Sequence, residues 1–150
     1  MSGAALNIWL IAAGLGSLAA SALHLACIIG GPVWYRFLGA GEGMARMATQ
    51  GSWVPAATTM SIAAVLAVWS AYAFSAAGLL ARFPLARTAL VLISAVLLLR
   101  AAAFFVRSSW RPDLSFGFML WSSLIVLALG LCFTIGTWQA WPELSEKAAK

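Results

Sequence analysis

The chain is poor in charged residues, and this scarcity excludes an ordinary soluble domain. Asp, Glu, Lys and Arg make up 9% of its 150 residues, 63% are hydrophobic, and the mean hydropathy is +0.96. A soluble domain is about one quarter charged and about half apolar. The apolar residues also stand in unbroken runs instead of alternating with polar ones, so the pattern excludes a membrane β-barrel as well.

Residues that bind metals are scarce too. The chain has one His and two Cys, whereas a zinc site takes three or four protein ligands. A haem held by two histidines cannot form within one chain. We therefore expect neither metal nor haem, and the sequence names no other cofactor. Cys27 and Cys132 fall at very different predicted depths in the membrane, so we expect small packed residues and no disulfide.

Acidic residues number four, and none lies within an apolar run. Ion pumping through an intramembrane carboxylate is therefore excluded. No pattern in the sequence brings together a nucleophile, a histidine and an acid, so we do not predict an enzyme. The net charge of +5 suits an anionic lipid surface. It does not predict nucleic-acid binding, because basic residues do not cluster with aromatic ones.

What the chain does have is long apolar runs, and these predict an all-α integral membrane protein. About 18 apolar residues are enough to cross a bilayer core of roughly 30 Å. Together the runs predict one transmembrane domain over 1–150, a four-helix bundle with a short polar tail at 143–150. Gly30, Gly31 and Pro32 are expected to end the first helix, and the fourth is expected to end before Pro142. The four predicted helices span 6–29, 53–80, 85–106 and 117–139.

Both chain ends are predicted to lie on one side of the membrane, called here the terminal side. The opposite side, with the joints around Arg36 and Arg111, is the loop side. Tryptophans mark both sides, as in aromatic belts: Trp9, Trp138 and Trp141 on the first, Trp34, Trp53 and Trp110 on the second. Basic residues balance four to four, namely Arg82, Arg87, Lys147 and Lys150 against Arg36, Arg46, Arg107 and Arg111. We expect both ends in the cytoplasm, and insertion in both directions as antiparallel dimers is the alternative.

The longest joint, 30–52, is predicted to be a Gly-rich interfacial loop between the first two helices. Trp34, Tyr35 and Phe37 beside Arg36 suit a segment lying along the membrane surface. Glu42 and Arg46 stand four residues apart in the favourable order for a helical ion pair. The segment is either a connector or a lid over a site.

Polar residues in the four runs are predicted to form one layer near the loop side. An ionisable side chain in a membrane segment is costly, so His24 and Arg100 are candidate site residues. They fall roughly 8 Å and 10 Å below the loop side, at the level of Thr58, Thr59, Ser122 and Ser123. Glu42 and Arg46 would join the layer if the loop folds inward. With no acid in any run, such a site would bind an anionic or carbonyl-bearing amphiphile, such as a lipid, a quinone or an organic anion.

Simpler roles for these residues stay open. The aliphatic part of Arg100 can extend toward the membrane surface, so that its guanidinium reaches the lipid headgroups. Hydroxyls in membrane helices often bond to backbone carbonyls. Small residues recur every four positions, at Ala12, Gly16 and Ala20 and at Ala63, Ala67 and Ala71. Such stripes allow close helix packing. Besides membrane lipids, the expected partners are therefore further copies of the chain or a larger membrane complex, with an accessory subunit as the alternative function.

The stretch 23–47, read with 55–72, resembles small four-helix inner-membrane proteins of proteobacteria. The resemblance implies a bacterial inner-membrane location and no activity. Three characterised groups of similar size do not fit. Small multidrug exporters need a carboxylate in the first helix, dual-topology fluoride channels need an asparagine signature, and glutathione-using membrane transferases need Arg- and His-rich motifs.

Overall fold

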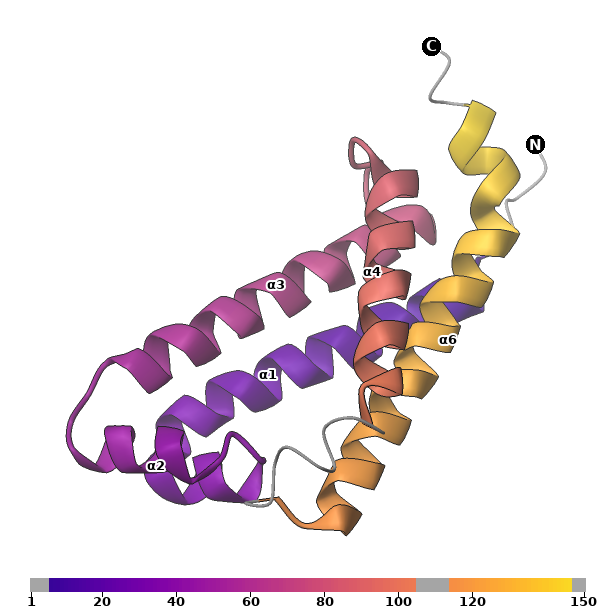
Figure 1. Cartoon of the computed structure of the whole chain (residues 1–150). Coiled ribbons are helices and arrows are strands. Elements are labelled where there is room, and N and C mark those ends of the chain that lie inside the picture. Colours follow the sequence, from indigo (N-terminus) through magenta and orange to yellow (C-terminus); the bar gives the residue numbers. More distant parts are fainter. Residues whose placement is uncertain (1–5, 105–113, 147–150) are drawn as a thin grey trace.

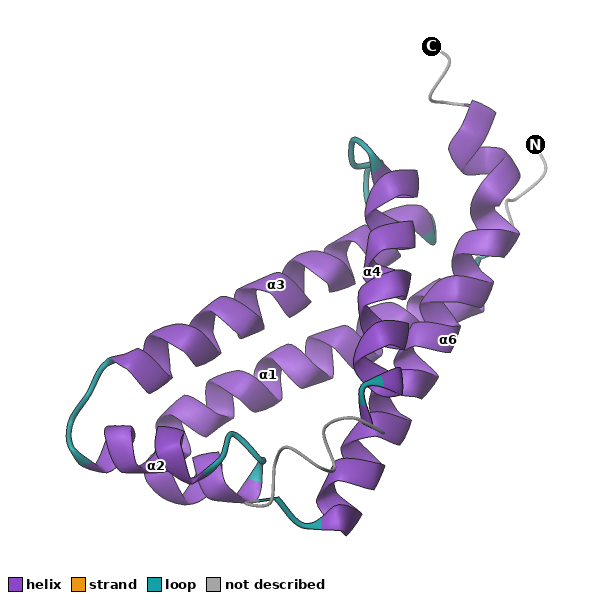
Figure 2. Ribbon diagram, viewed as in Figure 1, coloured by secondary structure: helices purple, strands orange, loops and turns teal. Residues whose placement is uncertain are grey.

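The computed structural model describes residues 6–104 and 114–146. The described part is helical, with short turns and loops and no strand (Figure 2). The prediction of an all-α chain is thereby confirmed. The helices are α1 (Ile8–Phe37), α2 (Glu42–Thr49), α3 (Val54–Ala76), α4 (Ala86–Ala102) and α6 (Phe116–Glu146).

The long helices form two antiparallel pairs, α1 with α3 and α4 with α6 (Figure 1). In the first pair, Ser21 Oγ donates a hydrogen bond of 2.8 Å to the carbonyl of Ala63. Ser70 Oγ donates one of 2.8 Å to the carbonyl of Gly14. Contacting positions rise along one helix as they fall along the other, which fixes the antiparallel register. The two pairs lie at an angle, and the start of α1 meets the second half of α6.

Among the described residues, three helices are long and apolar enough to cross a membrane: Ile8–Phe37, Val54–Ala76 and, within α6, Phe116–Ser145. Their outward surfaces carry large apolar side chains, with Ile29 exposed by 89% and Ile125 by 64%. A soluble monomer rarely exposes such continuous apolar surface, whereas lipid tails solvate it well. Length and surface together indicate a multi-pass membrane protein.

The first helix does not stop where the sequence predicted. Helical geometry breaks at Gly31, with φ 64° and ψ −148°, and then resumes to Phe37. Only glycine adopts such a positive φ without strain, and Pro32 is tolerated because it opens the new helical segment. Tyr35, from the resumed segment, is buried against Cys27 and Ala45. This packing explains why the kink does not end the helix.

The predicted Gly-rich loop is correspondingly shorter. Much of it is helical, in the last turns of α1 and in α2. Gly39 and Gly41 make the turn between them with φ of 74° and 95°. Gly39 also lies so close to Phe118 of α6 that a side chain there would overlap its ring.

Other predicted boundaries shift as well. The second helix ends at Ala76 instead of residue 80, because Gly78 turns the chain with φ 85°. The third is described over Ala86–Ala102, and its predicted end at 105–106 lies outside the described residues. The fourth continues through Pro142 to Glu146, where the sequence predicted an end before the proline. Leu144, beyond the proline, is buried in the core.

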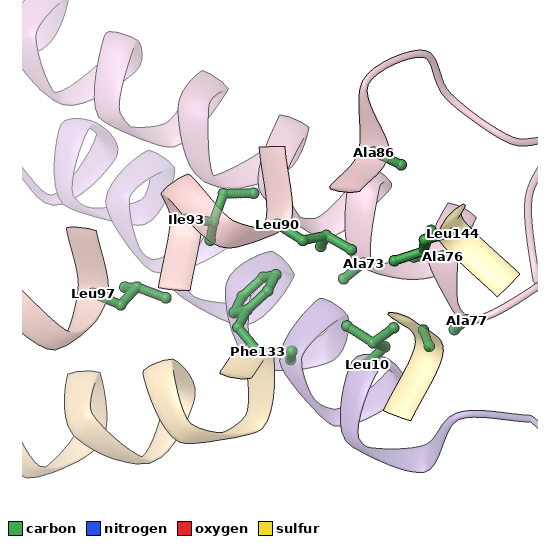
Figure 3. Close-up of a cluster of buried hydrophobic side chains, with 12 residues drawn as sticks. Leu10, Ala73, Ala76, Ala77, Ala86, Leu90, Ile93, Leu97, Phe133 and Leu144 are labelled. Carbon is green, nitrogen blue, oxygen red and sulfur yellow. The ribbon is translucent and has the colours of Figure 1, made fainter. Parts of the chain in front are cut away.

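The main core lies where the two pairs meet, toward the terminal side. Figure 3 shows Phe133 of α6 among Leu10 of α1 and Leu90 and Leu97 of α4. Small residues bring the backbones close, since a Cβ at Gly14 would lie 2.5 Å from Phe74 and one at Gly136 2.7 Å from Leu10. The cluster consists of Leu10, Ala13, Ala73, Ala76, Ala77, Ala86, Leu90, Ile93, Leu97, Phe133, Ala140 and Leu144.

Candidate functional site

One half of the predicted polar layer lies on the α1–α3 pair. His24 is half-buried, and its Nδ1 lies 2.7 Å from the carbonyl oxygen of Ala20. A carbonyl only accepts, so Nδ1 carries the proton and Nε2 of the neutral ring is an acceptor. The Ser21–Ala63 bond sets the register, which brings Thr59, one turn before Ala63, to the level of His24. Thr59 is buried, whereas Thr58 points to the outside.

The other half lies on the α4–α6 pair. Arg100 is half-buried in the last turn of α4. A Cβ at Gly130 would lie 3.2 Å from Leu97, so Arg100 is about one turn of α6 from Ser123. Ser123 is buried, and Ser122 Oγ donates to the carbonyl of Met119 at 3.1 Å. The predicted layer is thus divided between the two helix pairs, and its role as a ligand site stays a prediction.

Glu42 and Arg46 lie in an exposed ion cluster at the start of α2. The predicted pair is confirmed, with Arg46 Nε 3.3 Å from Glu42 Oε1. The stronger partner is Arg36, which the sequence interpretation did not pair with Glu42. Its Nε donates to Oε2 at 2.8 Å and its Nη2 to Oε1 at 3.1 Å. The cluster ties α2 to the end of α1.

Hydrogen bonding explains the acidity of Glu42. The bond from Arg36 holds the pKa of the Glu42 carboxyl below its usual 4.5, and the bond from Arg46 and the charges of both arginines act in the same direction. Partial desolvation opposes them. Both carboxylate oxygens are therefore engaged in ion pairs at neutral pH.

A groove that the sequence interpretation missed runs between α4 and α6, toward the terminal side. Its volume is about 510 Å³, and it is lined by Val91 and Ser94 of α4 and by Thr134, Thr137, Trp138, Trp141 and Pro142 of α6. Two of its hydroxyls bond to their own helices, Ser94 to the carbonyl of Leu90 at 2.8 Å and Thr134 to that of Gly130 at 2.7 Å.

The third hydroxyl of the groove is different. Thr137 is 5% exposed, and its Oγ1 has no hydrogen-bond partner among the described residues. Leaving a buried hydroxyl unpaired costs about 1–3 kcal/mol. The residue was not a candidate because a lone threonine in an apolar run normally bonds to its own helix. Only the contacts of the folded chain reveal that this one does not.

A positively charged side chain, that of Arg87, lies at the end of the groove nearest the terminal side. The guanidinium carbon of Arg87 is 3.7 Å from the ring centroid of Trp141, a cation–π geometry. Arg87 Nη1 also donates to Ser145 Oγ at 3.3 Å. Nearby, Arg82 donates to the carbonyl of Glu143 at 2.8 Å and lies 3.5 Å from its carboxylate.

Both cysteines are free and packed among apolar residues, as predicted. Cys27 is buried with Tyr35 and Ala45, and Cys132 packs against the main core. Within residues 6–104 and 114–146, no group of three or more His, Cys, Asp or Glu side chains gathers as a metal site would require.

Comparison with known proteins supplies no relative: no protein-family model, no curated protein and no solved structure matches this chain. The class of protein therefore rests on the fold. Three apolar helices of membrane-crossing length define a small, all-helical, multi-pass membrane protein.

Proposed function

We propose that this protein binds or transports an anionic or carbonyl-bearing amphiphile, such as a lipid, a quinone or an organic anion, at the polar layer near the loop side. In this proposal α4 also crosses the membrane, which gives a four-helix transmembrane bundle. Its 17 residues span about 25 Å, and Leu92, Val96 and Leu99 expose apolar side chains on it. We further propose a bacterial inner-membrane location with both ends cytoplasmic, and assembly as a homo-oligomer or within a larger membrane complex.

The observation that carries this proposal is the position of the core relative to the polar residues. The cluster that joins the pairs draws on α1 through Leu10 and Ala13, and on α3 through its last turns. His24 and Thr59 lie farther along the same pair toward the loop side, and Arg100 and Ser123 do so on the other pair. Polar groups from both pairs therefore lie beyond the main apolar core, toward the loop side.

The chemistry of the layer specifies the ligand. Arg100 supplies a permanent positive charge with planar donors, which suits a carboxylate, a phosphate or a carbonyl. His24, on the other helix pair, offers Nε2 as an acceptor when its ring is neutral. The favoured ligand therefore carries an anionic or carbonyl group on an apolar body.

The test is native mass spectrometry of protein released in a mild detergent, with an absorption spectrum of the same sample. We expect a defined added mass that is lost on Arg100→Ala. Arg82→Ala is the control, because it removes an arginine at the opposite end, in the loop between α3 and α4. A bare protein without absorbance, or a set of bound masses that Arg100→Ala leaves entirely unchanged, would refute the layer as the site.

A non-catalytic accessory subunit is the second candidate, supported by small residues left on the outer surface of α3. Ala64 and Ala67 are exposed and would let a partner helix approach closely. Gly16 does not serve this purpose, because a side chain there would overlap Leu129 of α6 within the same chain. Under this alternative Ala67→Leu lowers the mass of the assembled complex, and Arg100→Ala leaves it unchanged.

A further inference from the structure

We propose that the groove between α4 and α6 is a second binding site, independent of the loop-side layer, and that its occupant is an anionic phospholipid. The groove lies toward the terminal side, and its volume of about 510 Å³ falls within the usual range of small-molecule sites, about 300–1,000 Å³.

Deeper than Arg87, about midway along the groove, a hydroxyl lacks the hydrogen-bond acceptor that a lipid would supply. Thr137 Oγ1 is buried without a partner in the described part of the chain, although Ser94 and Thr134 beside it both bond to backbone carbonyls. Water does not satisfy such a group within the hydrocarbon region. An ester carbonyl is an acceptor that every diacyl phospholipid carries at the boundary between its headgroup and its chains.

The outer end of the groove carries the matching charge. Arg87, Val91 and Ser94 follow one another at helical spacing along one face of α4, and Arg87 stands about 10 Å above Ser94. The Arg87 side chain is exposed, and its bond to Ser145 uses one of its five N–H donors. Glu143, an acid near this end, is paired with Arg82. A phosphate at this end would therefore meet a cation whose charge no described acid neutralises.

The depth of Thr137 below Arg87 matches the order of groups in a phospholipid, in which the ester carbonyls lie deeper than the phosphate. Thr137 lies one helical turn, about 6 Å, deeper than Trp141, over which the Arg87 guanidinium stacks. A phosphate at Arg87 would thus place the ester carbonyls near Thr137, and an acyl chain would continue deeper, past the methyl group of Thr134. A zwitterionic headgroup brings its own cation toward Arg87, so the groove should prefer an anionic lipid.

Delipidated protein in detergent, titrated with phosphatidylglycerol or with phosphatidylcholine of the same chains, tests the proposal by native mass spectrometry. We expect one tightly held phosphatidylglycerol and weaker binding of phosphatidylcholine. Arg87→Ala should weaken phosphatidylglycerol binding by at least about tenfold and leave phosphatidylcholine nearly unchanged. Thr137→Val should weaken both lipids, and Thr137→Ser should restore them, because the serine keeps the hydroxyl.

Two controls show whether the lipid binds in the groove and through which of its groups. Arg100→Ala should leave phosphatidylglycerol binding intact, so failure of the loop-side site and failure of the groove are distinguishable. Glycerol phosphate alone should not bind, since it lacks the acyl chain and the ester. Equal binding of the two lipids, or phosphatidylglycerol binding that survives both Arg87→Ala and Thr137→Val, would overturn the proposal. If Thr137→Val does not fold, Arg87→Gln decides the matter alone.

Discussion

Buried hydroxyls in this chain differ in what their oxygens contact. Ser21 and Ser70 donate across the α1–α3 interface to carbonyls of the facing helix. Ser17 of α1 and Thr137 of α6 are equally buried, yet their oxygens have no partner within the described ranges. Interhelical bonds of this kind are worth about 0.6 kcal/mol on average in membranes, whereas an unpaired hydroxyl destabilises the fold. A buried hydroxyl therefore stabilises the fold where it donates to a facing carbonyl, and it destabilises the fold where it has no partner.

Serine-to-alanine substitutions in the α1–α3 interface should show this difference. Ser70→Ala removes the bond to Gly14 and should lower the free energy of unfolding by about 0.5–1.5 kcal/mol. Ser17→Ala removes a buried hydroxyl that has no partner among the residues described, so it should be neutral or raise that free energy. Both variants make the same chemical change on the same interface, so each controls for the other. Unfolding in a denaturing detergent, followed by circular dichroism, gives the comparison; equal losses at both positions would contradict it.

At the scale of helices, two predicted helix ends, at Gly31–Pro32 and at Pro142, are bends within continuing helices. Gly31 and Pro32 kink α1, and the helix continues because Tyr35 is buried on Cys27 and Ala45. Pro142 cannot donate to the carbonyl of Trp138, and α6 continues because Leu144 is buried in the core. In both cases burial of one side chain beyond the bend outweighs the local preference to stop.

The junction of α1 and α2 should depend on pH through Glu42. The pKa of its carboxyl is lowered in the folded protein, so the ion pairs stabilise the junction fully above the unfolded pKa. That stabilisation is lost as the pH falls through the lower pKa of the folded protein. We expect faster hydrogen exchange of the α2 amides in acid, and the same increase at neutral pH in Glu42→Gln.

The two arginines of this cluster provide an internal comparison. Arg36→Ala should speed exchange in α2 more than Arg46→Ala, since Arg36 makes two hydrogen bonds to the carboxylate and Arg46 makes one longer one. High salt should reduce both effects because the cluster is exposed. Exchange that does not respond to pH or to either substitution would show that apolar packing alone holds α2 in place.

For the whole molecule, the junction between the two helix pairs depends on a few large side chains. Phe133 is completely buried and packs between Leu10 of α1 and residues of α4. The contacts on either side of it are mostly alanines and leucines, so little else fills the same space. Loss of this ring should therefore separate the pairs before it unfolds the individual helices.

Phe133→Ala should lower the free energy of unfolding by about 3–5 kcal/mol. Trp121→Ala is the control, because Trp121 on the same helix is 68% exposed and faces outward. It should leave the free energy of unfolding nearly unchanged. A small effect of Phe133→Ala, with exchange in the helices unaltered, would mean that the pairs are held together elsewhere.

The small-residue stripes did not predict which face of α1 contacts which neighbouring helix. The sequence predicted a stripe at Ala12, Gly16 and Ala20, whereas the hydrogen bonds between α1 and α3 involve Gly14 and Ser21 of α1. Gly16 contacts α6 instead. A helix that is apolar on every side carries no pattern that fixes its rotation, so the face it presents to each neighbour cannot be predicted from spacing.

The sequence by itself determined that the chain is helical, that it is suited to a membrane, and roughly where each long helix lies. Run length and scarcity of charge suffice for that, because a bilayer core sets the length and excludes unpaired backbone groups. The tertiary structure alone decided which helix faces meet and where the helices bend and end. It also decided that Thr137 has no hydrogen-bond partner among the described residues, and that it lies in the groove whose outer end carries Arg87. Those features depend on which side chains are opposite one another across helices, and no local property of the sequence contains that information.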